Sequence, residues 1–281
     1  MTLFPSTNFE LTDQTFRQLT DFIYTNSGLR YDESSKYVLQ RRLSARVHEL
    51  RLESFEKYYY YLMYHPNREM ELEAIFDLIT INETYFFRED RQLRAFREEI
   101  IPDVMEARGD TRTMRIWSAG CSTGEEPYTI AMLCRQTPEI AGWDVDIFAS
   151  DISQKVIHTA RRGIYGESSF RSTHEPVRQL YFDRTPDNKF RIKEDVRTMV
   201  TFGKVNLLDE QKTGIFSELD VIFCRNVIIY FDVDAKKKVV ENFYKKLRKG
   251  GFLLLGHSES LLSLSTKFKL RHMKNDMVYQ K

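Results

Sequence analysis

The sequence has few cysteines, no long apolar run and no excess of either charge, and each of these features disfavours a class of protein. Only three of the 281 residues are cysteines, an odd number without metal-ligand spacing, which disfavours a disulfide framework or a zinc site and indicates reduced thiols. No stretch approaches the ~18 apolar residues of a transmembrane helix, and residues 1–10 lack the pattern of a secretory leader. We therefore expect a cytoplasmic protein without a metal and without membrane insertion.

The chain also lacks an excess of either charge. Lys and Arg number 42 and Asp and Glu 41, a net charge of +1, so no global attraction to nucleic acid or to a membrane is indicated, although a local patch can persist within a neutral total. The hydrophobic fraction of 42% and the charged fraction of 30% are typical of folded globular proteins. The length allows one large domain or two of ordinary size.

Helical periodicity dominates the sequence from residue 11 to about residue 81. Thr12 is expected to cap a first helix that ends at Gly28, and Ser54 to cap a third. Apolar stripes on the second and fourth helices are formed by Leu39, Leu43, Val47 and Leu50, and by Leu72, Ile75, Phe76 and Ile79. A charged amphipathic segment from 90 to 108 is expected to connect this part to the rest.

After Gly109, short apolar runs alternate with helical segments. The runs are expected to be buried parallel strands covered by helices, and they lie at 115–119, 145–149, 219–224 and 252–255. Segments 189–192 and 199–202 suggest a small antiparallel excursion. We predict a doubly wound α/β domain at 113–281 with a β-subdomain at about 182–205, preceded by an all-α domain at 1–89 and a helical linker at 90–112.

A glycine-bearing loop at 120–127 follows the first expected strand. Ligands of doubly wound sheets bind beyond the carboxyl ends of the strands, and Gly120 would allow close approach to the backbone. The loop lacks G-x-G-x-x-G, and Glu125 and Glu126 would repel a pyrophosphate at the helix start. A dinucleotide, and with it an NAD-dependent oxidoreductase, is disfavoured relative to a sulfonium nucleoside.

Polar side chains follow other strands as well. Asp151 comes after 145–149, where carboxylates of related folds bind ribose hydroxyls, although a helix-start role is the ordinary alternative. Arg225 and Asn226 follow 219–224, and Tyr230 lies in the apolar stretch beyond them, where an ordinary core aromatic is the alternative.

Four segments together resemble the chemotaxis receptor methyltransferases, which transfer a methyl group from S-adenosylmethionine to glutamate side chains of bacterial chemoreceptors. They read INETYFFRE at 81–89, WSAGCSTGEEPY at 117–128, FCRNVIIYFD at 223–232 and GHSES at 256–260, and the resemblance covers nearly the whole chain. It implies that Arg88 and Tyr230 lie nearest the methyl group as catalytic residues. It also implies a cofactor pocket lined by Asn82, Thr84, Arg88, Glu126, Asp151, Asn206, Leu207, Arg225 and Asn226.

The implied reaction explains why no acid–base dyad is expected. A glutamate acceptor, with a reference pKa of about 4.3, is already ionised at neutral pH and needs no general base. Bringing its oxygen into line with the methyl–sulfur bond and excluding water are the remaining tasks. Arg88 can orient a carboxylate through its fork of donors, and Tyr230 can donate one hydrogen bond, so both receive positioning roles.

A basic patch on the second helix is a candidate docking surface. Five basic residues and one acidic residue lie between residues 36 and 51, and Arg41, Arg42 and Arg46 lie opposite or beside the leucine stripe. A solvated face is the ordinary alternative, but the resemblance favours docking of receptor methylation helices, with recruitment to receptor arrays at the inner face of the membrane. Nucleic acid is disfavoured because aromatic residues are not interleaved with the basic ones.

Three further features leave room for other interpretations. The turn at 185–189 is short and lacks glycine, which favours a form of the family that does not bind a C-terminal peptide tether of the receptor. Cys121 is interpreted as a loop filler, and His257 as making a structural hydrogen bond. A catalytically silent module that binds S-adenosylmethionine is the competing hypothesis. Such a module would be expected to lack Arg88 or Tyr230, and both residues are present.

Overall fold

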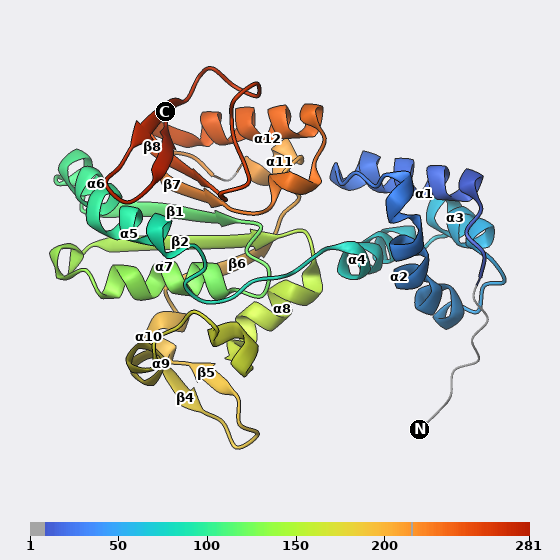
Figure 1. Ribbon diagram of the computed structural model, residues 1–281, viewed down its shortest axis with the longest axis horizontal. Helices are drawn as coiled ribbons and strands as arrows, with labels where there is room; N and C mark the ends of the chain where they lie inside the picture. Colours follow the sequence, from blue (N-terminus) through green and yellow to red (C-terminus); the bar gives the residue numbers. More distant parts are fainter. Residues whose placement is uncertain (1–8, 215) are drawn as a thin grey trace. The chain divides into compact units, whose positions relative to one another are not determined.

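Figure 1 shows the computed structural model, which describes residues 9–214 and 216–281. The chain divides into two compact units, Met1–Ile81 and Asn82–Lys281. The division therefore precedes the boundary at residue 89 that the sequence suggested. Phe86 accounts for the difference, because its ring is fully buried among Tyr165, Phe170 and Phe182 of the second unit.

The first unit is helical, as expected. Its helices are α1 Asp13–Ser27, α2 Lys36–Glu49, α3 Phe55–Tyr64 and α4 Arg68–Ile79, with a short 3-10 turn at Glu33–Ser35. The Thr12 side chain accepts the N–H of Thr15, and α1 ends at Gly28 with a φ of 73°, a left-handed conformation that suits glycine. Ser54 caps α3 by accepting the N–H of Lys57. The predicted caps are thus confirmed.

A buried polar network joins three of these helices beside the leucine stripe. Leu39, Leu43 and Val47 are fully buried on α2, whereas Leu50 is half-buried. Glu71 of α4 is only 2% exposed, and it accepts hydrogen bonds from Arg46 Nε and Nη2 at 3.0 and 2.7 Å and from the Tyr58 hydroxyl at 2.7 Å. The network fixes α2, α3 and α4 to one another.

The second unit is built on a seven-stranded sheet with the order β6-β2-β1-β7-β8-β10-β9. The strands are β1 Thr113–Ala119, β2 Asp144–Asp151, β6 Val200–Lys204, β7 Leu219–Cys224, β8 Leu247–Leu255, β9 Lys269–His272 and β10 Met277–Gln280. β1 pairs in parallel with both β2 and β7, and β9 and β10 form an antiparallel hairpin at one edge. The four predicted strands are all present.

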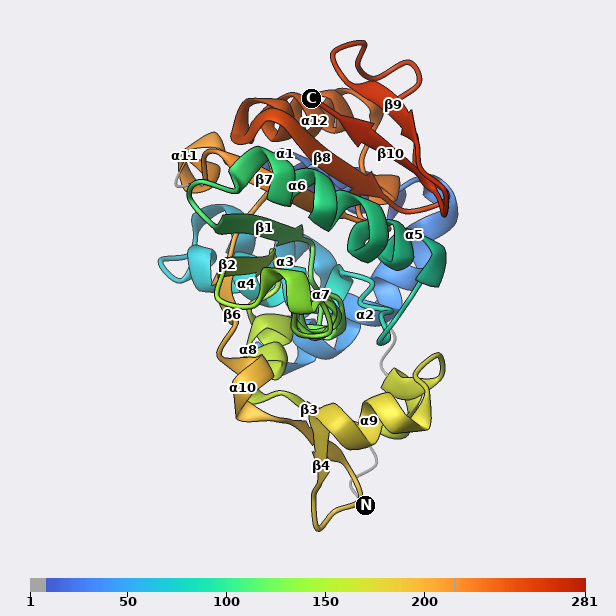
Figure 2. The ribbon, with the colours of Figure 1, turned by 90° about the vertical axis from the view of Figure 1, so that its left-hand side faces the viewer.

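Helices pack on both faces of this sheet. They are α5 Asp90–Ala95, α6 Ile101–Arg108, α7 Glu125–Arg135, α8 Gln154–Arg162, α11 Glu210–Thr213 and α12 Val233–Lys246, with a π-helical turn at Phe96–Ile100 and 3-10 turns at Pro138–Ile140 and Ile228–Tyr230. Figure 2 shows α5, α6 and α7 on one face. The connector expected at 90–108 is helical, and Phe96, Ile101 and Val104 bury it in the core of the second unit.

A smaller antiparallel sheet has the order β3-β5-β4. Its strands are β3 Ile164–Tyr165, β4 Phe182–Arg184 and β5 Phe190–Ile192, accompanied by α9 Glu175–Tyr181, α10 Glu194–Arg197 and a 3-10 turn at Glu167–Phe170. The predicted β-subdomain is present, but the assignment of 199–202 to it is wrong. That segment belongs to β6, which pairs in parallel with β2, and the Phe202 ring packs edge-on against Tyr128 of α7 at 5.4 Å.

None of the helices that the structure describes is long and apolar enough to cross a membrane.

Candidate functional site

The carboxyl ends of β1 and β7 mark the point where the strand order of the sheet reverses. From β1 the chain proceeds to β2 and β6 on one side, and it returns to β7 and β8 on the other. Crevices at such a switch point are where doubly wound sheets bind ligands. The loops that begin at Gly120 and Arg225, and Asp151 at the end of β2, all lie at this edge.

The loop after β1 meets the loop after β7 at Gly120. The φ of Gly120 is 84°, and a Cβ atom there would lie 2.4 Å from Cγ2 of Val227. The N–H groups of Gly120 and Cys121 donate to the Ser150 carbonyl at 2.8 and 2.9 Å. Glycine is required because the loop is hydrogen-bonded to β2 while the Val227 side chain of the loop after β7 packs against it.

Asp151 fixes the backbone around the crevice. Its Oδ2 accepts the N–H of Ser122 at 2.9 Å, and its Oδ1 accepts the N–H of Ser153 at 3.0 Å, next to the cap of α8. The side chain is 9% exposed. The helix-start contact is thus real.

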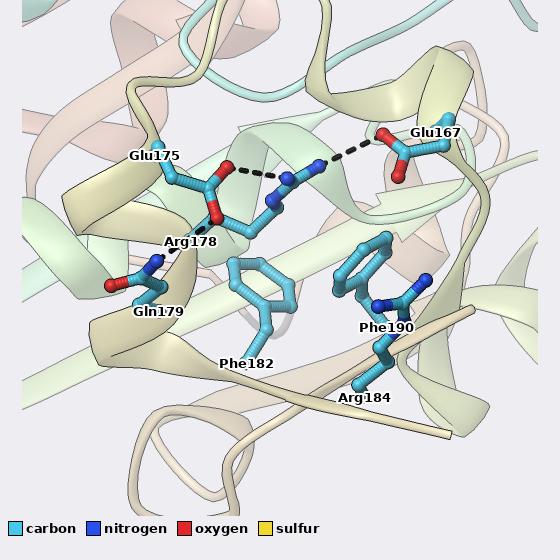
Figure 3. A pocket seen from close by; sticks show the side chains of 7 residues that line it. All are labelled: Glu167, Glu175, Arg178, Gln179, Phe182, Arg184 and Phe190. Atoms are coloured by element: carbon cyan, nitrogen blue, oxygen red, sulfur yellow. Dashed lines mark hydrogen bonds and ion pairs between the residues drawn. The ribbon is translucent and has the colours of Figure 1, made fainter. Parts of the chain in front are cut away.

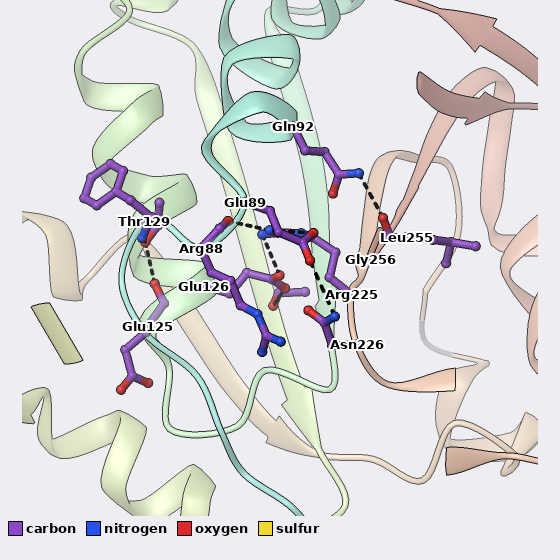
Figure 4. Close-up of polar contacts among 12 residues, drawn as sticks. Arg88, Glu89, Gln92, Glu125, Glu126, Thr129, Arg225, Asn226, Leu255 and Gly256 are labelled. Carbon is purple, nitrogen blue, oxygen red and sulfur yellow. Dashed lines mark hydrogen bonds and ion pairs between the residues drawn. The ribbon is translucent and has the colours of Figure 1, made fainter. Parts of the chain in front are cut away.

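Arg225 lies between two carboxylates at this edge of the sheet (Figure 4). Its side chain is 3% exposed; Nη1 lies 3.2 Å from Oε2 of Glu126, and Nη2 lies 3.2 Å from Oε2 of Glu89 and also donates to the Arg88 carbonyl. Ser118 donates to the other oxygen of Glu126 at 2.7 Å. Burial raises the pKa of Glu126, and the charge of Arg225 opposes that rise. With both carboxylates ionised, the cluster has a net charge of −1.

Two buried polar atoms in this cluster are unsatisfied. Arg225 Nε and Asn226 Oδ1 have no hydrogen-bond partner within 9–214 and 216–281, and both are shielded from solvent. Asn226 has a φ of 59°, which turns the chain sharply at the end of β7, and its Nδ2 lies 3.5 Å from Glu89. Buried polar groups are normally paired, so a donor and an acceptor left open here suit a polar ligand.

Glu259 holds the loops after β7 and β8 together. Its carboxylate accepts backbone N–H groups from Gly256 at 2.7 Å, Asn226 at 2.8 Å, Val227 at 2.9 Å and Ile229 at 3.2 Å. Burial raises the pKa of Glu259, whereas these four donors act in the opposite direction. A Cβ atom at Gly256 would lie 2.7 Å from Nδ2 of Asn226, so this approach requires glycine.

The other candidate cofactor residues lie around the same crevice. Ser122 Oγ donates to the Asn82 carbonyl at 3.1 Å, which brings residue 82 to the loop that Asp151 holds. Val205 donates to the Asp151 carbonyl at 3.0 Å, so Asn206 and the buried Leu207 follow at the adjacent strand end. Thr84 is half-buried on the segment that leads to Arg88.

The two candidate catalytic residues are half-buried. Arg88 Nη1 donates to the Glu83 carbonyl at 2.9 Å, and its guanidinium lies 5.8 Å from the centroid of the Tyr85 ring. Tyr230 is in the 3-10 turn after β7, next to the backbone that Glu259 anchors.

Sequence reasoning missed two members of the site and misjudged a third. Glu89 and Glu259 lie within two of the motif segments, but no role was assigned to them because most of their partners are distant in the chain. Glu125 does not face the crevice: its carboxylate accepts from Thr123 at 2.6 Å and from Ser169 at 2.9 Å, and burial raises its pKa. Only Glu126 of this acidic pair contributes its charge to the cluster.

The structural interpretations of Cys121 and His257 are supported. Cys121 is buried, and burial raises the pKa of its thiol well above the usual value, which disfavours a thiolate nucleophile. Nε2 of His257 lies 3.0 Å from Oδ2 of Asp276, so the ring links the loop after β8 to the hairpin.

Two of the three predicted docking arginines are engaged within the helical unit. Arg41 is exposed, but Arg42 Nη1 donates to the carbonyls of Ile79 and Thr80. Arg46 pairs with the buried Glu71 and with Glu49. The expectation that all three charges are available is therefore wrong, because a buried carboxylate and the end of α4 require their donors.

A separate cavity of about 240 Å³ lies in the small sheet (Figure 3). Arg178 projects into it between Glu167, at 2.8 Å, and Glu175, with its guanidinium 4.6 Å from the centroid of the Phe190 ring. Its charge is compensated locally, and the cavity contains none of the strand-end residues.

A doubly wound sheet with this strand order and an antiparallel hairpin at its edge is the fold of S-adenosylmethionine-dependent methyltransferases. Residues 82–277 match the family described as "CheR methyltransferase, SAM binding domain", and residues 14–80 match "CheR methyltransferase, all-alpha domain". The chain belongs to the CheR methyltransferase family.

Relatives of similar length support this assignment. The chain is 36% identical to "Chemotaxis protein methyltransferase 2" of Vibrio cholerae, over 96% of this chain and 94% of the relative. It is 36% identical to "Chemotaxis protein methyltransferase" of Borreliella burgdorferi, over 90% of each. It is 34% identical to the protein of that name in Salmonella typhimurium, over 93% of this chain and 88% of the relative.

Proposed function

We propose that the protein transfers the methyl group of S-adenosylmethionine to glutamate carboxylates of bacterial chemoreceptors, forming methyl esters and S-adenosylhomocysteine. The observation that carries this proposal is the Glu126–Arg225–Glu89 cluster at the switch point of a CheR cofactor-binding domain, with Arg225 Nε and Asn226 Oδ1 left open beside it. When bound, the cofactor supplies an electrophilic methyl group on a sulfonium.

The residues of the crevice fit such a cofactor. The cluster's net negative charge suits a cationic ligand, and the open donor and acceptor suit a polar one. Asp151, a carboxylate at the end of β2, would accept hydrogen bonds from the ribose hydroxyls, and Gly120 leaves the loop backbone without a side chain. Asn82, Thr84, Asn206 and Leu207 would complete the binding site. A metal is not part of the proposal, because an ionised acceptor needs no Lewis acid to attack a sulfonium methyl group.

Arg88 and Tyr230 would position the acceptor. Both side chains are half-buried. Arg88 carries the N–H donors of its guanidinium, and Tyr230 carries one hydroxyl donor. A carboxylate held by one or two such donors remains nucleophilic while its oxygen is oriented. Neither residue needs to move a proton, so the rate should depend on geometry and on exclusion of water.

The receptor would be recognised in the cytoplasm by the helical unit. Arg41 is the exposed member of the proposed docking set, and it would attract acidic methylation helices. The turn between β4 and β5 is short, with Thr185 accepting from Lys189 at 3.1 Å, which supports a form that does not depend on a C-terminal tether.

Incubation with labelled S-adenosylmethionine and receptor-containing membranes tests the function. Base-labile label on the receptor is expected, and none on receptor whose methylatable glutamates are replaced by alanine. Label that resists base, or that is independent of these glutamates, would overturn glutamate esterification. Tyr230→Phe is the matched enzyme variant: it removes only one hydroxyl and should transfer less label than the wild type.

A further inference from the structure

The total charge is near neutral, but basic and acidic residues are distributed very unevenly along the chain. Residues 236–281 contain twelve Lys or Arg and three Asp or Glu, a net charge of +9, whereas residues 1–235 contain 30 and 38, a net charge of −8. The basic segment comprises most of α12 together with β8, β9 and β10. In Figures 1 and 2 it forms one end of the second unit, coloured orange to red.

The arginines of this segment are used internally. Arg248 pairs with Asp220, which is fully buried, and Arg271 contacts Gln280 at 2.8 Å and Asp103 at 3.6 Å. Both guanidinium forks therefore have partners within the fold. Charges that face outward without a partner come from lysines.

Four lysines form what we call the lysine face: Lys237, Lys238 and Lys245 on α12, and Lys249 near the start of β8, the strand that follows α12 directly. All four are exposed, and the ammonium group of none of them forms an ion pair or hydrogen bond with another residue that the structure describes. At 100° per residue, the three helical lysines fall within an arc of about 100°. Val239, Val240 and Phe243 of the same helix are buried against the sheet.

Two acidic residues share this arc without cancelling it. Glu241 is neutralised by Lys267, whose Nζ lies 2.7 Å from its carboxylate. Asp234 is in the first turn of α12, where a negative charge offsets the positive end of the helix dipole. With Glu241 paired and Asp234 counted in full, the four lysines leave the lysine face with an outward charge of +3.

We propose that the lysine face docks the protein electrostatically on an anionic phospholipid bilayer. Clusters of four to eight basic residues on a helix suit anionic lipid headgroups, which they attract without insertion. Ammonium groups are hydrated point charges that suit diffuse attraction, whereas stereospecific phosphate recognition favours arginine, and here both arginines are occupied. Nucleic acid is a poorer fit because Tyr244, the half-buried aromatic beside the face on α12, already packs against Phe268, Lys267 and Lys281.

The use of this surface rests on the proposed function, since a chemoreceptor substrate is itself held in a membrane. Attraction to the bilayer would concentrate the enzyme near its substrate and would weaken with ionic strength. Binding to lipid itself requires neither receptor nor methyl transfer, so it is measured separately.

Co-sedimentation of the full chain with vesicles tests the proposal. Binding is expected to vesicles of phosphatidylcholine with phosphatidylglycerol at low salt, but not to phosphatidylcholine alone or at high salt. Replacing the four lysines of the face with Gln should weaken binding on the order of a hundredfold or more. The matched control, with Gln at Lys57, Lys155, Lys189 and Lys212, changes the charge equally on other exposed surfaces and should bind like the wild type.

The outcomes are distinct. Failure of the wild-type protein to bind anionic vesicles, or equal binding by the two variants, would overturn the proposal. Binding to soluble polyglutamate without binding to vesicles would overturn it in favour of an acidic protein partner. Unchanged S-adenosylmethionine affinity in both variants checks their folding, and a wild type that binds vesicles without methylating receptor would reject the proposed function alone.

Discussion

Glu259 is a single side chain on which the geometry of two strand-end loops depends. Glu259→Gln retains the size of the side chain but replaces one acceptor oxygen with an NH₂ group that faces backbone donors. At least one of its four backbone contacts must be lost, and the Asn226 segment should shift. We expect S-adenosylmethionine affinity, measured by calorimetry, to fall by about 1–3 kcal/mol.

Glu241→Gln is the matched control for this change. Glu241 lies in the same unit, but its partner is the half-exposed Lys267, so the same substitution should leave cofactor affinity unchanged. Wild-type affinity in Glu259→Gln would show that the loop positions do not depend on the carboxylate.

Asp151 carries the proposed ribose contact in addition to its backbone contacts. Asp151→Ala should weaken both S-adenosylmethionine and S-adenosylhomocysteine by about 1–3 kcal/mol, because charge-assisted hydrogen bonds are lost and the Ser122 N–H is released. Asp151→Asn retains one acceptor oxygen and should lose less. Calorimetry with both ligands measures the effect, and unchanged affinity in Asp151→Ala would rule out the ribose assignment.

Tyr230 and Arg88 are expected to act on turnover more than on folding. Tyr230→Phe retains the ring and removes only the hydroxyl, and Arg88→Ala removes a half-exposed guanidinium. Both should reduce kcat for receptor methylation while the free energy of unfolding changes little, since the proposed roles are in orientation. Full turnover by Tyr230→Phe would return Tyr230 to the class of packing aromatics.

At the scale of elements, α2 is held to α4 by an ion pair and also presents a free charge. Arg46→Ala leaves Glu71 buried without its cation and should lower the free energy of unfolding by about 3 kcal/mol, whereas Arg41→Ala should change it by less than about 0.5 kcal/mol. Urea unfolding followed by circular dichroism measures both. Equal effects would contradict the structural role of Arg46.

The same comparison decides how docking should be tested. Arg41→Ala isolates the exposed charge and is expected to raise the KM for receptor modestly at low salt. A triple change that includes Arg46 would confuse docking with stability.

The elements that local chemistry specifies were predictable. Thr12 and Ser54 are cap residues whose contacts lie within three positions, and the run 219–224 coincides with β7. The segment 199–202 was misplaced because its apolar residues allow either sheet, and only its parallel pairing with β2, which is distant in the chain, selects the main one. Residues 90–108 read as a connector because burial of Phe96 and Val104 depends on β1 and β7, which come later.

The candidate site was predictable where a residue follows a strand. Asp151, Arg225 and Asn226 were found in that way, and the rule needs no tertiary information. Glu259 was not found because three of its four backbone donors, including Ile229, lie 30 or more positions earlier in the chain. Glu89 reaches Arg225 across 136 positions, and no local pattern reports such a contact.

At the scale of the molecule, the division into units follows from where aromatic residues are buried. Phe86 stacks with Phe170 at 5.1 Å and meets Phe182 edge-on at 5.0 Å, so the segment after residue 81 belongs to the second core. Its sequence contains no proline or glycine to mark the change, which explains why the boundary was expected later. The unit that binds the proposed cofactor thus begins at Asn82.

Both tryptophans of the chain, Trp117 and Trp143, lie in this second unit, so their fluorescence reports its unfolding. A ligand that binds only the folded state stabilises it by mass action. S-adenosylhomocysteine at roughly 100 times its Kd should therefore raise the free energy of unfolding in urea by about 2.7 kcal/mol. A chelator should leave this increment unchanged, since the proposed contacts need no metal, and Asp151→Ala should reduce it at the same ligand concentration. An unfolding midpoint that does not change when the ligand is added would contradict cofactor binding. If the chelator abolished the increase in the free energy of unfolding, a metal-free site would be contradicted.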